Sequence, residues 1–245
     1  MSWKFEVHEE LGSTSDLCKS YAESSSQDKI AVQALRQTGG RGTRGRQWVD
    51  PGGNLAISFL LRPNAFQDFL MAVPFLVALA VHDAVTEHCG HFLNSASLQL
   101  KWPNDLLLNK RKLAGILIET GGTTEGQNGW VVIGIGVNVA SAPEIPGREL
   151  AALADLGGVW DVEELGRKIG GALDIRFAEW IEGGFDAVRT EWLKLAHPVG
   201  HRLAVRRGEI YIEGEFSGLD QMGRLLLTCS NGETIPVVTG EILLG

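Results

Sequence analysis

Arg36-Gln-Thr-Gly-Gly-Arg-Gly-Thr-Arg-Gly-Arg-Gln-Trp48 places four arginines and four glycines in 13 residues without an acid, in a chain whose net charge is −8. Glycine lets backbone N–H groups turn toward a ligand, and arginine presents a planar fork of hydrogen-bond donors. This stretch, the arginine loop, therefore predicts a cradle for an anion such as a phosphate or a carboxylate. A solvated basic loop is the alternative for an Arg/Gly run.

The glycine spacing of the arginine loop fits none of three familiar motifs. Gly40, Gly42 and Gly45 satisfy G-x-G-x-x-G, but that motif must open a helix, and residues 48–53 read as a turn. A phosphate-binding loop requires Lys-Ser/Thr where Arg46-Gln47 stands, and a protein kinase requires a later His-Arg-Asp, which the sequence lacks. The loop therefore belongs to none of these classes.

The segments around the loop alternate between strand and helix signals. Strands are predicted at residues 5–8, 30–35, 54–61 and 130–139. Helices are predicted at residues 15–24, 69–89, 161–180 and 185–195. Pro74 is expected near the first turn of its helix, where proline is tolerated. Ser13 and Thr14 read most simply as helix caps. The strands on either side of the loop would hold its backbone donors in place.

A second informative stretch is Leu100-Lys-Trp-Pro-Asn-Asp-Leu-Leu-Leu-Asn-Lys-Arg-Lys-Leu-Ala-Gly-Ile-Leu-Ile-Glu119. It predicts a hairpin with strands at 106–108 and 113–118 and a turn at 109–112. Polar groups gather at its base, namely Lys101, Asn104, Asp105 and Lys112. Glycine inside a strand, at Gly115, indicates close approach by a ligand or by backbone. The hairpin therefore suggests a pocket lined by these polar groups. The alternative for Lys110-Arg-Lys112 is a solvated hairpin tip, which is more common for such a run of charges.

Composition narrows the class of protein. The three cysteines, Cys18, Cys89 and Cys229, are odd in number and lie far apart, which favours a reducing cytoplasm and no metal site. The N-terminus has no apolar signal-peptide core, and the apolar run at 69–81 is too short to span a bilayer. A nucleic-acid-binding protein would be expected to carry a basic footprint, and this chain is acidic.

The composition changes at His197-Pro-Val-Gly200. Beyond it, short strands separated by glycine turns are predicted at residues 202–206, 209–213, 214–219, 224–228 and 234–238. This pattern predicts a small β-barrel at residues 197–245, after a main domain at residues 1–196. A unit of this size is at the low end for independent stability, so we expect it to pack on the main domain.

Six motifs follow one another along the chain: Gly12-Ser-Thr-Ser15, Gln37-Thr-Gly-Gly-Arg-Gly-Thr-Arg-Gly-Arg-Gln-Trp48, Gly53-Asn-Leu-Ala-Ile-Ser58, Lys101-Trp-Pro-Asn-Asp105, Arg111-Lys-Leu-Ala-Gly-Ile-Leu117 and Gly134-Ile-Gly-Val-Asn138. Their combination and order closely resemble the biotin–protein ligases, also called biotin–[acetyl-CoA-carboxylase] ligases or holocarboxylase synthetases. The resemblance covers essentially the whole chain, and the arginine loop together with Lys-Trp-Pro-Asn-Asp is its most specific part.

The resemblance implies a fold, a reaction and partners. The fold is an α+β (α/β) catalytic domain of the class II aminoacyl-tRNA synthetase and biotin–lipoate ligase type, followed by an SH3-like barrel. In the reaction, the carboxylate of biotin attacks the α-phosphate of ATP, with Mg²⁺, to give biotinyl-5′-AMP. A lysine of a biotin carboxyl carrier protein, from acetyl-CoA carboxylase or another biotin-dependent carboxylase, then attacks the mixed anhydride. Monomer and homodimer are both compatible with the sequence.

The resemblance also implies roles for individual residues. Those expected to bind biotin are Ser13, Thr14, Ser15, Gln37, Arg41, Gly42, Thr43, Lys112 and Gly115. Those expected to bind ATP and the adenylate are Arg41, Arg44, Arg46, Trp48, Asn104, Lys112 and Asn138. The expected catalytic residues are Lys112, Asp105 and Arg41, with Lys112 on the carboxylate and the anhydride phosphate. Asp105 would help to activate the incoming lysine or a magnesium ion.

Two departures from the family pattern stand out. Members often carry arginine where Thr43 stands, so this loop has lost one cation. Because the Ser-Thr motif begins at residue 13, neither the winged-helix DNA-binding domain of some members nor their repressor function is expected.

Three alternatives stay open beside biotin ligation. They are a lipoate or octanoate ligase, a regulator that senses biotin or nucleotide, and a nucleic-acid-binding module. The hairpin motifs oppose the first. The presence of both Asp105 and Lys112 opposes the second, since a sensor need not keep both, and the net charge opposes the third.

Overall fold

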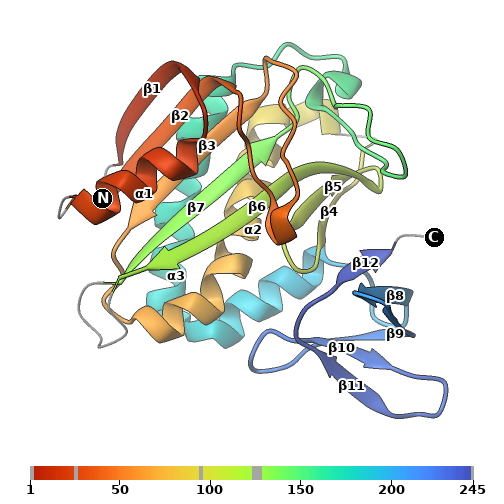
Figure 1. Ribbon diagram of the computed structural model, residues 1–245. Helices are drawn as coiled ribbons and strands as arrows, with labels where there is room; N and C mark the ends of the chain where they lie inside the picture. The colour runs from red at the N-terminus through yellow and green to blue at the C-terminus, as the bar shows by residue number, and fades with distance from the viewer. Residues whose placement is uncertain (1–2, 25–26, 94–95, 123–128, 244–245) are drawn as a thin grey trace.

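A mixed seven-stranded sheet forms the centre of the main domain in the computed structural model, which describes residues 3–24, 27–93, 96–122 and 129–243 (Figure 1). Its strands run in the spatial order β1-β2-β3-β7-β6-β5-β4. They are β1 (Lys4–Leu11), β2 (Ile30–Gln37), β3 (Leu55–Leu61), β4 (Leu98–Lys101), β5 (Asp105–Leu108), β6 (Arg111–Gly121) and β7 (Trp130–Val137). β1 and β2 are parallel, and the other neighbours are antiparallel. All residues of β3 are buried, as expected for a strand covered on both faces.

Helices cover both faces of this sheet and give the domain three layers. Helix α1 (Thr14–Ser24) packs on one face, where Cys18 and Ala22 meet Ile30, Leu60 and other apolar side chains. Helices α2 (Phe66–Cys89) and α3 (Val162–Leu195) pack on the other face and against each other. The stretch Phe66–Leu93 is long and apolar enough to cross a membrane, but 67% of its most apolar window is buried. It is therefore the core helix of this domain.

Two local expectations need correction. Helix α2 begins at Phe66, so Pro74 is its ninth residue and lies in the interior rather than near the first turn. Packing in the surrounding core compensates for the backbone hydrogen bond that proline cannot donate. The predicted turn at 109–112 is shorter, because positive φ angles at Asn109 (50°) and Lys110 (65°) complete it and β6 resumes at Arg111. Lys112 therefore belongs to β6, and its backbone is fixed within the sheet.

The long helix keeps its predicted break, whereas the last strands differ from expectation. The helices predicted at 161–180 and 185–195 are the two parts of α3, which meet at a kink where Gly184 takes the non-helical angles φ 66° and ψ −171°. The strands predicted at 209–213 and 214–219 are one strand, β9 (Ile210–Leu219). Gly214 lies against the Thr228 backbone, where a Cβ would approach the carbonyl oxygen to 2.8 Å, so this glycine permits close pairing and does not break the strand.

A second, five-stranded antiparallel sheet follows α3 in the order β11-β10-β9-β8-β12. Its other strands are β8 (Arg202–Arg207), β10 (Leu225–Thr228), β11 (Thr234–Val237) and β12 (Glu241–Leu243). Its apolar residues continue the core of the main domain. Trp102 donates from Nε1 to the Gly223 carbonyl at 3.2 Å, and Phe75 of α2 packs against Gly223. These contacts bring β12 up to the arginine loop (Figure 1).

Candidate active site

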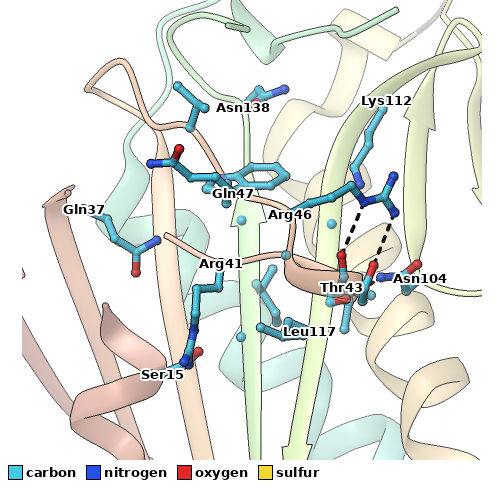
Figure 2. A pocket seen from close by; sticks show the side chains of 18 of the residues that line it. Ser15, Gln37, Arg41, Thr43, Arg46, Gln47, Asn104, Lys112, Leu117 and Asn138 are labelled. Carbon is cyan, nitrogen blue, oxygen red and sulfur yellow. Dashed lines mark hydrogen bonds between the residues drawn. The ribbon is translucent and has the colours of Figure 1, made fainter. Parts of the chain in front are cut away.

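A cavity lies between the arginine loop and the exposed face of β6 and β7 (Figure 2). Alternate residues of a strand point to one face, and here Gly115 and Leu117 of β6 are paired with Gly136 and Gly134 of β7. These residues form the floor. The whole lining consists of Ser13, Thr14, Ser15, Gln37, Arg41, Gly42, Thr43, Arg46, Gln47, Trp48, Val49, Ile57, Asn104, Lys112, Gly115, Ile116, Leu117, Gly134, Ile135, Gly136, Asn138, Pro143, Ile145, Arg148 and Leu150.

The glycines of the floor make room for the Trp48 indole. A Cβ at Gly136 would lie 2.4 Å from Cε2 of Trp48, and a Cβ at Gly115 would lie 3.2 Å from its Cζ3. The loop is folded back on itself by hydrogen bonds from Trp48 N to the Gly40 carbonyl (3.0 Å) and from Gly42 N to the Arg46 carbonyl (2.8 Å). Trp48 therefore forms one apolar wall of the cavity. The centroid of its ring lies 5.8 Å from Lys112 Nζ.

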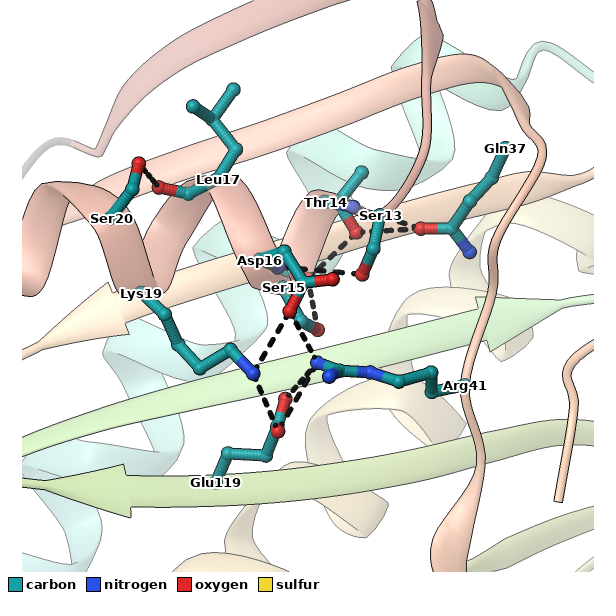
Figure 3. A network of polar contacts seen from close by, with 11 residues as sticks. Ser13, Thr14, Ser15, Asp16, Leu17, Lys19, Ser20, Gln37, Arg41 and Glu119 are labelled. Atoms are coloured by element: carbon teal, nitrogen blue, oxygen red, sulfur yellow. Dashed lines mark hydrogen bonds and ion pairs between the residues drawn. The ribbon is translucent and has the colours of Figure 1, made fainter. Parts of the chain in front are cut away.

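At one end of the cavity, buried hydroxyl groups form a connected cluster (Figure 3). Ser58 of β3 is fully buried, and its Oγ lies 2.8 Å from Thr14 Oγ1 and 2.9 Å from Ser15 Oγ. The Gln37 side-chain oxygen accepts from the Thr14 amide at 2.9 Å and from its hydroxyl at 3.2 Å. Ser13 Oγ accepts from Asp16 N at 3.3 Å and so caps α1. The expected cap is present, and its neighbours also face the cavity.

Toward the middle of the cavity, the base of the β5–β6 hairpin positions a lysine. Lys112 Nζ lies 2.5 Å from Asp105 Oδ1. A Cβ at Gly115 would stand 3.1 Å from the same Nζ, so glycine leaves the ammonium space to reach the floor. Asn104, after the cis Trp102–Pro103 bond, donates to the Ile116 carbonyl at 2.6 Å and so secures β6. Burial lowers the pKa of Lys101, which is paired with Asp105 in the sheet, and the carboxylate acts against that shift.

At the other end, Asn138 follows β7 with 2% of its surface exposed. Its side-chain nitrogen donates to the Ala151 carbonyl at 3.0 Å, and its Oδ1 has no hydrogen-bond donor within the described part of the chain. The following turn is fixed by Asn54, whose Oδ1 accepts from Val139 N at 2.8 Å and Ala140 N at 3.0 Å. A buried, unpaired acceptor that lines a cavity indicates a ligand with a donor group.

The arginines of the loop are engaged by carboxylates from distant parts of the chain. Arg41 Nη2 lies 2.9 Å from Asp16 Oδ1 and from Glu119 Oε2. Arg46 Nη1 lies 2.7 Å from Glu241 Oε1, and Arg44 donates to the Gly240 carbonyl. Burial acts to raise the pKa of Glu241, but the hydrogen bond and charge of Arg46 outweigh it, so that pKa is lowered. The loop is therefore tied to α1 and β6 through Arg41, and to β12 through Arg44 and Arg46.

Most residues predicted for the site lie on this one cavity, while Asp105 and Arg44 are outside the lining. Asp105 contacts Lys112, which does line the cavity, and Arg44 donates to the Gly240 carbonyl just before β12. Sequence reasoning missed Ser58, although a serine inside the apolar strand Leu55–Leu61 was a usable signal. It also missed Arg148, which lines the cavity together with Pro143, Ile145 and Leu150 from the irregular segment after β7. That segment has no motif of its own and could not be placed without coordinates.

Family models match two parts of the chain. The model described as the biotin/lipoate A/B protein ligase family matches residues 9–138, and the biotin protein ligase C terminal domain matches residues 201–245. A biotin–[acetyl-CoA-carboxylase] ligase of Paracoccus denitrificans is 37% identical over 227 residues, which cover 87% of this chain and 90% of that protein. The bifunctional ligase/repressor of Escherichia coli K12 is 30% identical and is covered over 66% of its length by 87% of this chain.

Solved structures show the same architecture. Biotin protein ligase from Aquifex aeolicus in complex with biotin and ATP superposes with a TM-score of 0.79 at 27% identity, covering 98% of this chain and 97% of that chain. Biotin protein ligase from Leishmania major in complex with biotinyl-5-AMP superposes with a TM-score of 0.64 at 27% identity, covering 98% of this chain and 100% of that chain.

Proposed function

The chain belongs to the biotin/lipoate A/B protein ligase family, and from this premise we propose that it is a biotin–protein ligase. It activates biotin with ATP to biotinyl-5′-AMP and transfers the biotinyl group to a lysine of a biotin carboxyl carrier protein. The observation that carries the proposal is a single cavity that joins a buried hydroxyl cluster, a lysine and an unpaired buried amide under a cationic loop. The predicted family and fold class are confirmed by the matches to family models and to solved ligases.

The hydroxyl cluster binds the ureido end of biotin. Ser13, Thr14, Ser15 and Gln37 offer donors and acceptors side by side, and a ureido group needs both within a few ångströms. Because the hydroxyls of Thr14 and Ser15 share Ser58, their orientation is set before the ligand arrives. Beside this cluster, the part of the cavity lined by Leu117 offers an apolar surface to the ring and chain of biotin.

Lys112 acts where two anions meet. The biotin carboxylate attacks the α-phosphate, a new C(O)O–P bond forms, and pyrophosphate leaves with the bonding electrons. An ammonium between the carboxylate and the phosphate stabilises the charge that develops there, and such groups are worth most in a site that excludes water. Asp105 holds Lys112 in place, with Lys112 Nζ 2.5 Å from Asp105 Oδ1.

Asp105 is also proposed to serve the second step. The lysine amine of the carrier attacks the carbonyl carbon of the mixed anhydride, AMP leaves, and the amine must lose a proton. A carboxylate at the base of the hairpin can receive that proton or help to orient the amine. Arg41, Gly42 and Thr43 would cover biotin and the phosphate from the loop side, and Asn104 would support the adenylate from below.

The nucleotide end is formed by Trp48 and Asn138. The indole offers a flat apolar face for the adenine, and the unpaired Oδ1 of Asn138 accepts a hydrogen bond from its exocyclic amine. Arg44 and Arg46 would add positive charge beside the phosphates, with Arg46 already on the cavity wall.

Magnesium enters with ATP as part of the substrate. Among the residues that the structure describes, no group of three or more His, Cys, Asp or Glu side chains could hold a metal ion. Mg²⁺ usually keeps several waters and binds through substrate phosphates with one or two carboxylates. Asp105 is the carboxylate proposed to meet it.

The wider assignment rests on the same family. Because the relative from Paracoccus denitrificans is named for acetyl-CoA carboxylase, we propose the carrier protein of that enzyme as the acceptor, with carriers of other biotin-dependent carboxylases as further acceptors. Cys18, Cys89 and Cys229 are free, which supports a cytoplasmic location for the reaction. A homodimer is compatible with this function, and neither membrane nor nucleic acid takes part in the proposed reaction.

Pyrophosphate exchange into ATP tests the proposal and separates it from lipoate or octanoate ligation. The protein is incubated with MgATP and labelled pyrophosphate, and with biotin, lipoate or octanoate in parallel. Exchange that depends on biotin alone is the expected result. Exchange with lipoate or octanoate instead would move the protein to the other branch of the family, and a folded protein without exchange would favour a sensor.

A further inference from the structure

An ionic clasp closes the hydroxyl-lined end of the cavity (Figure 3). It consists of Asp16 and Lys19 of α1, Arg41 of the arginine loop and Glu119 of β6. Each cation contacts both carboxylates: Lys19 lies 2.9 Å from Asp16 and 3.0 Å from Glu119, and Arg41 lies 2.9 Å from each. The four side chains therefore form a ring of alternating charge that joins three separate parts of the fold.

The position of the clasp follows from the strands and helix that carry it. Gly115, Leu117 and Glu119 point to the same face of β6 because side chains alternate along a strand. Gly115 and Leu117 form the cavity floor, so Glu119 continues this row to the rim. Ser15 lines the cavity from the first turn of α1, and Asp16 is the next residue. Both carboxylates are thus placed at the rim where the hydroxyl cluster ends.

The loop needs such a tie because its own sequence makes it flexible. Its glycines enlarge the number of open conformations, and every open conformation exposes the hydroxyl cluster to water. Arg41 Nη2 contacts both oxygens of Glu119, at 3.2 Å and 2.9 Å, and so is held in one geometry. The Glu119 side chain is 24% exposed and that of Lys19 is 23% exposed, so water screens these charges less than on an open surface.

Lys19 contacts both carboxylates of the ring. Burial by itself lowers the pKa of its ammonium, but the hydrogen bonds to Asp16 and Glu119 outweigh that effect, and the pKa is raised. Lys19 lies outside the cavity lining. Its contribution is to neutralise the two carboxylates, which would otherwise repel each other across the rim.

From this geometry we propose that Glu119 and Asp16 are positioning residues that retain biotin by fastening Arg41 over its end of the cavity. The proposal rests on the proposed function, because it assigns biotin to the hydroxyl cluster. The clasp acts on the rate at which biotin leaves and not on the nucleotide, whose end of the loop is fastened separately by Glu241. Exposed and partly exposed ion pairs contribute modestly one by one, so loss of either carboxylate should speed biotin release by about 2- to 5-fold.

The test compares Glu119→Gln and Asp16→Asn with the unaltered protein and with Glu10→Gln. Glu10 pairs with Arg36 at 2.9 Å at the start of the same loop, on a surface away from the cavity, so it is a matched control for the loss of an exposed ion pair. Biotin dissociation is followed by stopped-flow tryptophan fluorescence, and the KM of MgATP is measured by pyrophosphate exchange at saturating biotin. Melting temperatures establish that each variant is folded.

The expected result is faster biotin dissociation in Glu119→Gln and Asp16→Asn, with a KM for MgATP that changes less than about twofold. Dissociation from the unaltered protein should rise with salt, and this dependence should be weaker in Glu119→Gln. Glu10→Gln should behave as the unaltered protein.

Three outcomes would overturn the proposal. They are unchanged biotin dissociation in both variants, slower dissociation, which would mean that the clasp holds Arg41 away from the ligand, and an equal effect on MgATP. If the unaltered protein binds biotin and supports exchange, such a failure concerns the clasp alone. If it binds no biotin at all, the proposed function fails and the clasp fails with it.

Discussion

Gly136→Ala perturbs the contact on which the nucleotide end of the cavity depends. A Cβ at this position would lie 2.4 Å from Cε2, 2.6 Å from Cζ2 and 2.8 Å from Nε1 of Trp48. Carbon atoms in favourable contact stay about 3.5–4.0 Å apart, so the indole must retreat by roughly 1 Å to restore such contact. β7 is paired with β3 on one side and β6 on the other, which holds its backbone in place.

Two effects of Gly136→Ala follow. Overpacking of a well-filled site costs about 1–3 kcal/mol, which lowers the melting temperature by about 2–12 °C in a chain of this size. Displacement of Trp48 also removes the surface on which the adenine lies. Stacking of a base on an aromatic side chain is worth about 1–3 kcal/mol, so the KM of MgATP should rise about 5- to 150-fold, while the dissociation constant of biotin changes little.

The assay combines pyrophosphate exchange, calorimetry with biotin and thermal unfolding. Gly171→Ala is the control, since an added Cβ at this exposed position of α3 meets nothing within 4 Å and should stabilise the helix. The double variant Gly136→Ala/Trp48→Ala completes a cycle, because removal of the indole should abolish the extra cost of the alanine. An unchanged KM and melting temperature in Gly136→Ala would contradict the clash with Trp48. So would an equal loss of stability from Gly136→Ala in the presence and in the absence of the Trp48 indole.

Four further predictions follow from the site. Lys112→Ala should lower the rate of biotin-dependent exchange by about 10²–10³-fold with the fold intact by circular dichroism; near-normal exchange contradicts its role. Ser58→Ala should weaken biotin binding by calorimetry and cost about 1–3 kcal/mol of stability in denaturant unfolding, because two buried hydroxyls lose their shared partner; unchanged values in both assays count against the cluster. Glu241→Gln should raise the KM of MgATP up to about 5-fold without affecting biotin release, and an effect on biotin alone would reverse the assignment. Burial, with the charges of His201 and Lys101, lowers the pKa of His197 from 6.5 to about 4. The unfolded chain therefore takes up more protons between these values, so stability should be full above pH 6.5 and fall toward pH 4 by up to about 3 kcal/mol; His197→Gln should flatten the decline in melting temperature, and an identical slope refutes the burial argument.

Local patterns predicted the elements that carry the site. The apolar runs before and after the arginine loop are the strands β2 and β3, which pair with each other. Ser13 does cap a helix, whereas the Thr14 hydroxyl contacts Gln37 and Ser58 instead. The polar residues of the hairpin base do meet, with Lys112 on Asp105. In each case the decisive interactions lie close in sequence or follow from the alternation of a strand.

The partners of the loop arginines could not be predicted. Arg41 meets Glu119, 78 residues away, and Arg46 meets Glu241, 195 residues away. Any acid in the chain was an equal candidate, because ion pairs leave no periodic signal. The loop looked like a free anion cradle, whereas all four of its arginines already contact carboxylates or a carbonyl of the chain.

Interior packing explains the other misjudgements. Pro74 was assigned to a first turn because a proline in the middle of a helix is costly, yet tertiary contacts around α2 override that local preference. Ser58 was overlooked because it stands within an apolar strand, and its value depends on Thr14 and Ser15, which only the fold brings next to it.

Transfer of biotin to a carrier protein is the most direct test of the account. The protein is mixed with MgATP, biotin and a biotin carboxyl carrier domain of acetyl-CoA carboxylase, and the carrier is analysed by intact mass and peptide mapping. We expect the mass gain of one biotinyl group on a single lysine, dependent on ATP and lost in Lys112→Ala. An unmodified carrier, or one modified by lipoate or octanoate in place of biotin, would contradict it.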